Sequence, residues 1–325
     1  MLKLKKEIKG IILATVIGLL GYFISSFLPS SFNSILMALL LGIIVGNFIK
    51  IPGDFQSGIG FTSSRLLELS ILFLAFSINY KHIAALGVES FSAIFIMVIL
   101  MLLVSYYLAK KVKFPGSTGW LIGFGTTICG SSAIAALAPT VSKNKDDVGI
   151  SMAVVNLFGS IGMILMPFIL IRLNISTQEM GLLIGGTLHS VGNVVGAGYS
   201  LGNEVGEAAI TIKLARVALL SPALIFFNFL VNRHQVTHWK EHFSLPWYLW
   251  SFIAITVITS FISFPQSFIK MMDDAGKLVL TIAMAAIGLK VSFKTIYLSG
   301  QKGLIFGLIA FAAQILIITL CLLMF

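Results

Sequence analysis

Two basic residues lie inside an apolar stretch of the chain, where a charged side chain is costly. Lys213 and Arg216 belong to the run 208–217. Residues three apart share one face of a helix, and each cation deep in a bilayer costs about 2.5–3.5 kcal/mol on insertion scales. Two on one face therefore need a partner or a wet cavity. A small oxyanion is one such partner, which Arg grips with a planar fork of donors while Lys adds a point charge.

Acidic residues elsewhere in the chain are the alternative partners for these two cations. The candidates are Glu68, Asp273 and Asp274, and Lys213 could instead extend outward to the membrane surface. A buried acidic side chain in a membrane is also a candidate site for a coupling ion or proton. For Asp273 and Asp274, which lie near Lys277, we favour an interfacial salt bridge.

Two Gly-rich segments, near 117–142 and 177–200, interrupt the apolar pattern. Glycine costs about 1 kcal/mol relative to alanine inside a helix, so we expect both segments to break. Irregular backbone at membrane depth survives only where protein or a water-filled cavity solvates it. An offset of 60 (185 minus 125) pairs Gly125 with Gly185 and Cys129 with His189. Two interrupted segments in corresponding positions predict a transporter binding site.

Small polar side chains gather at the tips of these segments and are candidates for binding the substrate. Helix N-termini at the breaks would present free N–H groups to an anion, whereas C-terminal carbonyls could hold sodium. Close packing of small residues is the alternative role. The candidates are Thr126, Thr127, Ser131, Ser132, Thr187, Ser190 and Asn193.

His189 is the histidine with an apolar context on both sides. It could carry a proton or donate to an anion, or it could bond to a neighbouring helix. His234, His238 and His242 are spaced by four and could ligate a metal, but their position indicates a loop. We therefore predict no metal site and no cofactor.

The composition indicates an all-α polytopic membrane protein. Of 325 residues, 58% are hydrophobic and 10% are charged, and the mean hydropathy is +1.01. Soluble domains carry about 25% charged residues. The net charge of +10 comes from short clusters at the ends of apolar runs, which argues against nucleic-acid binding. The sequence contains no Ser/His/Asp arrangement, HExxH or phosphate loop, so we expect neither an enzyme nor an ATP-driven pump.

Apolar windows long enough to cross a bilayer of roughly 30 Å occur along the whole chain. Lysines in the first nine residues place the N-terminus in the cytoplasm, so we expect a multi-pass protein of a bacterial inner membrane. The Gly-rich segments are either re-entrant hairpins, which we prefer, or broken crossing helices. The predicted spans lie near 11–28, 33–49, 64–81, 88–109, 147–171, 207–231, 246–263, 268–289 and 303–324.

A weak internal repeat relates the two halves. An offset of 213 (265 minus 52) pairs Pro52 with Pro265, and the same shift pairs a lysine and a glycine further on. An odd number of crossings separates the copies, so they would be inverted, as in many secondary transporters. We expect one transmembrane unit over 1–325, with an N-terminal helix in 1–32 and repeats in 33–172 and 177–325.

In chain order, the motifs resemble those of the YeiH-type sulfate exporter family. The resemblance covers nearly the whole chain and implies two inverted repeats, a core that moves against a scaffold, a homodimer, and kinship with bile-acid sodium symporters and cation:proton antiporters. The motifs are TTICGSSA at 126–133, TLH at 187–189, VVGAG at 194–198, KLARV at 213–217, SP at 221–222, PW at 246–247, PQS at 265–267 and AMAAIGL at 283–289.

The chain departs from that family pattern at three positions. Ser190 stands where the pattern has Glu, Asn193 where it has Gln, and Glu68 where it has Arg. If the glutamate at the position of Ser190 carries a coupling proton in the family, this chain has no such carboxylate there. We expect a secondary active transporter of a small anion (sulfate, sulfite or sulfonate-like), working by alternating access. A sodium- or proton-coupled organic solute transporter and an anion channel are the alternatives.

Overall fold

The computed structural model describes residues 2–28, 33–78, 86–111, 117–142, 145–231, 247–291 and 301–324, and every regular element in them is helical. The chain is an all-helical, multi-span membrane protein. Its described residues form two compact units, each assembled from segments that are distant in the sequence. Unit 1 contains Met1–Ala85, Val195–Glu207 and Trp247–Phe293, and unit 2 contains Leu86–Val194, Ala208–Pro246 and Lys294–Phe325.

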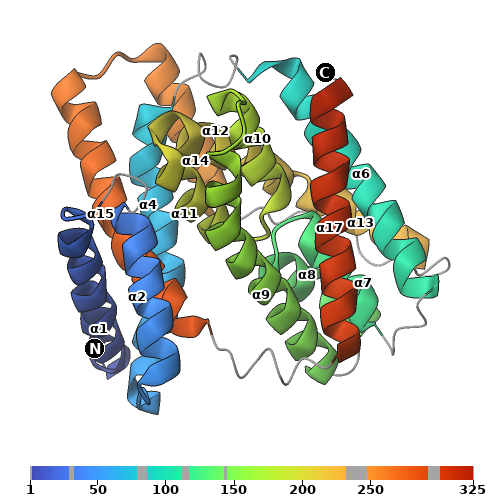
Figure 1. Cartoon of the computed structure of the whole chain (residues 1–325), viewed down its shortest axis with the longest axis horizontal. Helices are drawn as coiled ribbons and strands as arrows, with labels where there is room; N and C mark the ends of the chain where they lie inside the picture. Colours follow the sequence, from blue (N-terminus) through green and yellow to red (C-terminus); the bar gives the residue numbers. More distant parts are fainter. Residues whose placement is uncertain are drawn as a thin grey trace. The chain divides into compact units, whose positions relative to one another are not determined.

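Unit 1 is built on three helices that lie side by side in Figure 1, α1 (Leu2–Ser25), α2 (Ser34–Phe48) and α15 (Gln266–Lys290). Small residues let α2 and α15 approach closely. A Cβ on Gly42 would lie 2.3 Å from the carbonyl oxygen of Ala285, so the two backbones are in contact there. Such contacts between small residues are how membrane helices gain packing energy.

The rest of unit 1 is the helix α14 (Trp247–Phe261) and a helical segment over Gly53–Ser77. That segment consists of the 3-10 turn η1 (Gly53–Phe55), α3 (Gln56–Phe61), the π turn η2 (Thr62–Leu66), α4 (Leu67–Leu74) and the 3-10 turn η3 (Ala75–Ser77). The predicted span near 64–81 therefore begins earlier than expected, because Gly58 and Gly60 do not interrupt the helix.

The helical stretches 53–77 and 266–290, which the offset of 213 relates, both lie in unit 1 and run antiparallel. Lys290 Nζ donates to Ser63 Oγ over 3.2 Å, and a Cβ on Gly276 would touch Leu74 at 3.0 Å. The repeat relates position 63 to 276 and position 77 to 290 (63 plus 213, 77 plus 213). Equivalent helices that contact each other reciprocally are related by a pseudo-two-fold axis, which supports the inverted repeat.

Unit 2 contains the helices that carry the Gly-rich segments and those that surround them. α17 contacts α6, α7, α9 and α10, so α17, red in Figure 1, is central to this unit. α11 (Val191–Leu201) and α12 (Asn203–Ala218) each pass from one unit into the other. The unit's own helices are α6 (Gly87–Lys111), α7 (Thr118–Thr127), α8 (Ser131–Val141), α9 (Lys145–Leu170), α10 (Thr177–Thr187), α13 (Leu220–Val231) and α17 (Gln301–Met324).

Both Gly-rich segments are broken, as predicted. α7 ends and α8 begins around Ile128–Gly130, and α10 gives way to α11 around Leu188–Ser190. At the first break Gly130 has φ of 75°, a conformation that suits glycine, and its N–H donates to the carbonyl of Gly125 over 2.8 Å. α7 and α8 pack against each other beside this break. That each segment is a re-entrant hairpin and not a broken crossing helix stays a prediction.

A third break falls within the predicted span over 207–231. α12 and α13 are bent by 42°. Pro222, the third residue of α13, has no N–H for the carbonyl of Ala218, and its ring would clash with that carbonyl in a continuous helix. The predicted span over 207–231 is therefore bent at Pro222, a residue that was visible in the sequence.

Five described helices are long and apolar enough to cross a membrane, or six if the bent pair α12 and α13 counts as one span. Among the other predicted spans, α2 and α14 are apolar but only 15 residues long. α15 has 25 residues but carries several charges in its first half. The assignment of these three as full crossings stays a prediction.

Candidate functional site

Lys213 is completely buried in unit 2 and lies between the two breaks. Its Nζ donates to the carbonyl oxygen of Ile128 at 2.8 Å and to that of Leu188 at 2.9 Å. Ile128 follows α7 and Leu188 follows α10, so one side chain of α12 joins the two broken segments.

Arg216 is also completely buried and binds the same two segments through its whole guanidinium group. Nη2 donates to the carbonyls of Thr127 at 2.7 Å and Thr126 at 3.0 Å, and Nε also reaches Thr127 at 3.3 Å. Nη1 donates to the carbonyls of Gly185 at 2.8 Å and Leu188 at 3.1 Å. The planar fork thus links the last turns of α7 and α10.

The chemistry of this arrangement is the capping of helix C-termini. The last carbonyls of a helix have no partner within the helix, and they carry its negative dipole end. In the part of the chain that the structure describes, every hydrogen bond of Lys213 and Arg216 goes to such a main-chain carbonyl. Carbonyl dipoles solvate the two cations but do not neutralise their charge.

The N-termini of the other two half-helices meet at the same place. Gly130 precedes the first residue of α8, and a Cβ on it would lie 3.6 Å from the carbonyl of His189, which is two residues before α11. The first N–H groups of a helix and its positive dipole end favour an anion. Both breaks therefore contribute an anion-favouring helix end next to the buried cations.

His189 lies at this junction with neither ring nitrogen bonded to a described residue. Its side chain is 1% exposed and packs against Phe311, with ring centroids 5.1 Å apart. A Cβ on Gly159 would lie 3.4 Å from its Nδ1, so Gly159 leaves room for the ring. The predicted alternative of a hydrogen bond to a neighbouring helix is not found among the described residues. Buried polar groups normally have a partner, so the unbonded ring nitrogens of His189 are an exception that calls for an explanation.

Several of the predicted hydroxyls bond to the backbone near the helix ends. Thr127 Oγ1 donates to the carbonyl of Gly123 at 2.7 Å, and Thr187 Oγ1 donates to the carbonyl of Leu183. Ser190 Oγ accepts the N–H of Asn193 at 3.1 Å, as an N-cap does. Thr126 contributes its carbonyl, to Arg216.

Ser131 and Ser132, at the start of α8, lie on a more open surface. Ser131 Oγ donates to Asn156 Oδ1 at 2.8 Å, and Ser132 Oγ lies 2.9 Å from Cys129 Sγ. Ser132 and Asn156 are exposed although Asn156 is near the middle of the apolar helix α9. An exposed amide in the middle of an apolar helix is costly if it faces lipid.

Two residues of the site were missed from the sequence, Asn156 and Gln314. Gln314 is fully buried in α17, and its Nε2 donates to the carbonyl of Gly186 at 2.8 Å, beside the second break. Each is an amide inside a long apolar helix, and that isolation was the signal that the sequence offered.

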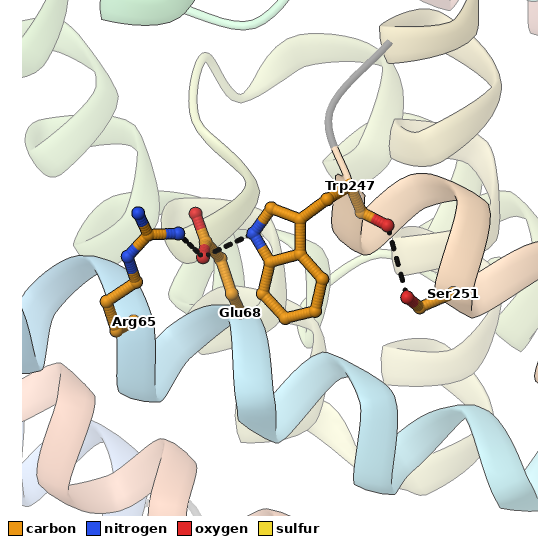
Figure 2. A network of polar contacts seen from close by, with 4 residues as sticks. All are labelled: Arg65, Glu68, Trp247 and Ser251. Carbon is orange, nitrogen blue, oxygen red and sulfur yellow. Dashed lines mark hydrogen bonds and ion pairs between the residues drawn. The ribbon is translucent and has the colours of Figure 1, made fainter.

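The three coupling-ion candidates, all in unit 1, lie in surface or interfacial contacts. Figure 2 shows Glu68 Oε2 accepting from Arg65 Nη1 at 3.0 Å and from Trp247 Nε1 at 2.9 Å, while Ser251 Oγ donates to the Trp247 carbonyl. Asp273 forms an ion pair with Lys277, one turn further along α15, as expected for a salt bridge.

Asp274 is exposed. The histidines His234, His238 and His242 lie outside the described residues. Among the described residues no group of three His, Cys, Asp or Glu side chains could hold a metal ion.

Comparison with known proteins places this chain in a family of membrane proteins. The family model described as conserved hypothetical protein 698 matches residues 9–307. The UPF0324 inner membrane protein YeiH of Escherichia coli (strain K12) is 31% identical over 315 residues, covering 94% of this chain and 90% of the relative. A UPF0324 membrane protein of Helicobacter hepaticus is 30% identical over 321 residues, covering 93% of each.

A solved structure, the sodium proton antiporter MjNhaP1 from Methanocaldococcus jannaschii, matches 95% of this chain and 99% of that chain with 15% identity and a TM-score of 0.31. The sequence relatives confirm the YeiH-type resemblance and a multi-pass protein of the inner membrane. The chain therefore belongs to the conserved hypothetical protein 698 family, which includes the UPF0324 membrane proteins.

Proposed function

We propose that this protein is a secondary active transporter of a small anion of the sulfate, sulfite or sulfonate class, working by alternating access. One observation carries the proposal: two completely buried cationic side chains, Lys213 and Arg216, lie where both broken segments meet, and carbonyls alone bind them there among the described residues.

The charge balance of this region favours an anionic ligand. An arginine keeps its positive charge in proteins, and an uncompensated buried charge is strongly unfavourable. The N-termini of α8 and α11 add positive partial charge, and His189 offers an unbonded ring nitrogen. One anion bound at these N-termini would compensate the charge and supply the missing partner of His189.

The polar side chains beside the junction support a route for such an anion. Ser132 and Asn156 are exposed and adjoin the first turn of α8, whereas Asn193 and His189 are buried. We infer that the anion reaches the junction along α8 and α9, past polar side chains. The antiparallel repeat copies in unit 1 support a carrier, since inverted repeats allow equivalent inward and outward states. A homodimer is part of the same proposal.

Counterflow into proteoliposomes tests this function. Vesicles preloaded with sulfate, sulfite or taurine are mixed with trace labelled anion, and accumulation is followed for the wild type, His189→Ala and Arg216→Ala. Lys302→Ala is the matched control, because Lys302 is an exposed basic residue of the same unit. We expect counterflow of one anion in the wild type and the control, a large loss in His189→Ala and no transport in Arg216→Ala.

Two results would contradict the proposal. The absence of counterflow for every anion in a correctly folded preparation would exclude this substrate class. Flux that scales with concentration without counterflow, at rates far above those of carriers, would indicate an anion channel built on the same helix ends.

A further inference from the structure

The carbonyl groups around Lys213 have the arrangement of a cation site. Five main-chain oxygens from the two breaks bind two neighbouring cations of α12: Lys213 Nζ binds those of Ile128 and Leu188, and the Arg216 guanidinium binds those of Thr126, Thr127, Gly185 and Leu188. Unwound carbonyls and half-helix C-terminal ends are the groups that coordinate sodium in transporters with broken helices. In this protein the cations that bind these carbonyls are side chains of the protein itself, Lys213 and Arg216.

Of the two side chains, Lys213 resembles a free monovalent cation more closely. Its ammonium group is a compact point charge, and its Nζ contacts one carbonyl from each break, Ile128 at 2.8 Å and Leu188 at 2.9 Å. Both residues have non-helical backbone angles, so their oxygens lie outside the regular helices. Arg216 takes up the remaining three carbonyls and shares that of Leu188.

We propose that Lys213 is the covalently tethered occupant of a monovalent-cation site, and that the transporter therefore binds no dissociable sodium ion at its breaks. The negative helix ends of α7 and α10 are satisfied permanently, whichever anion is bound. The consequence for transport rests on the proposed function, whereas the existence of the cation site does not.

The acidic residues of the chain are consistent with this proposal. Among the described residues no carboxylate bonds to the carbonyl cluster or to its two cations, so Lys213 and Arg216 are the only charges bonded to these carbonyls there. Glu68 and Asp273 are engaged by Arg65 and Lys277 within unit 1.

The first experiment measures cation binding without transport. Lys213→Ala removes the equivalent of propylammonium, so thermal unfolding of the purified full-length protein is followed in sodium, potassium, propylammonium or choline chloride at equal ionic strength. We expect propylammonium or sodium to raise the Tm of Lys213→Ala by about 3 °C or more over choline, and to leave the wild type unchanged.

Lys213→Met is the matched variant, because its side chain fills the space of the lysine stem and offers no charge. We expect it to be as unstable as Lys213→Ala in choline and to gain nothing from any cation. Equal Tm values of Lys213→Ala in all four salts would overturn the proposal, as would stabilisation of the wild type by sodium.

The second experiment uses the wild type and does not depend on a folded variant. Counterflow is measured with sodium, potassium or choline as the sole monovalent cation, and we expect the same rate in all three. A rate that falls tenfold or more without sodium would overturn the inference while leaving the anion transporter intact. If no anion moves in any salt, the proposed function fails, and the Tm measurement still decides whether the cation site exists.

Discussion

The two units differ in the groups that bind their basic side chains. In unit 1 two basic side chains that are more than half exposed meet carboxylates: Arg65 lies 3.0 Å from Glu68 and Lys9 lies 3.2 Å from Asp54. In unit 2 Lys213 and Arg216 are completely buried and meet only carbonyls among the described residues.

Under the proposed function, this difference separates charge that serves the fold from charge that would serve a ligand. Exposed ion pairs contribute about 0–1 kcal/mol and leave no net charge behind. A buried cation held by carbonyl dipoles is well solvated but still positive, so the region keeps a field that an anion can use. The contrast predicts that substitutions around Lys213 and Arg216 in unit 2 change transport, whereas those at the unit 1 pairs do not.

The largest effect is expected from Arg216→Ala. The guanidinium makes contacts with four carbonyls of two segments, and a hydrogen bond to a charged group contributes about 1.5–3 kcal/mol. We expect a loss of about 3 kcal/mol or more in stability, measured by denaturation in detergent, together with a complete loss of transport.

Arg216→Lys keeps the charge but not the planar fork, so we expect an intermediate stability and residual transport at most. If Arg216→Ala unfolded at the wild-type temperature, the guanidinium would not hold the two segments together. The comparison between the units would then lose its main support.

Gly159→Ala moves the polar groups of the site without touching either cation. A Cβ there would lie 2.2 Å from Asn193 Nδ2, so the amide must move away. Overpacking costs about 1–3 kcal/mol, and we expect the low end because the atom that must shift ends a side chain. Transport should fall about tenfold or more, since about 1.4 kcal/mol of lost site interaction is a factor of ten. Unaltered transport would place Asn193 outside the anion path.

The Asp273–Lys277 pair tests whether the ion pairs of unit 1 leave transport unaffected. Both side chains are partly exposed, at 17% and 28%, so screening limits the contribution of the pair. A double-mutant cycle with Asp273→Asn and Lys277→Met should give a coupling energy of about 0.5–1 kcal/mol. Counterflow should stay close to the wild-type rate at every pH tested. A lost or pH-shifted rate in Asp273→Asn would restore this carboxylate as a coupling site.

Glu68→Gln should have the smallest effect. The Gln side chain can still accept from Trp247 Nε1, so only the attraction to the exposed Arg65 is lost. We expect a change of about 0.5 kcal/mol or less, which disappears as salt is raised. A destabilisation that persists at high salt would show that the indole contact depends on the carboxylate charge.

The amino-acid sequence by itself determined the class of protein, most of the helix positions and the two main breaks. Long apolar runs can be satisfied in a membrane only as helices, and glycines at 123–130 and 185–198 weaken the helix wherever it runs. The cost of placing Lys213 and Arg216 in an apolar run also marked both residues as functional candidates. The bend at Pro222 was accessible to the same reasoning, but an uninterrupted apolar pattern concealed it.

Only the tertiary structure decided what those two cations bind. The sequence predicted an anion or an acidic side chain, because charge partners have identifiable residue types. Main-chain carbonyls belong to every residue alike, so no residue type marks the ones that a helix end leaves unpaired. Their convergence depends on how α7, α10 and α12 pack, and that packing also brought Gly130 to His189 and Asn156 to Ser131. The local sequence pattern determines where each helix ends. Packing between distant segments determines which helix ends lie next to each other.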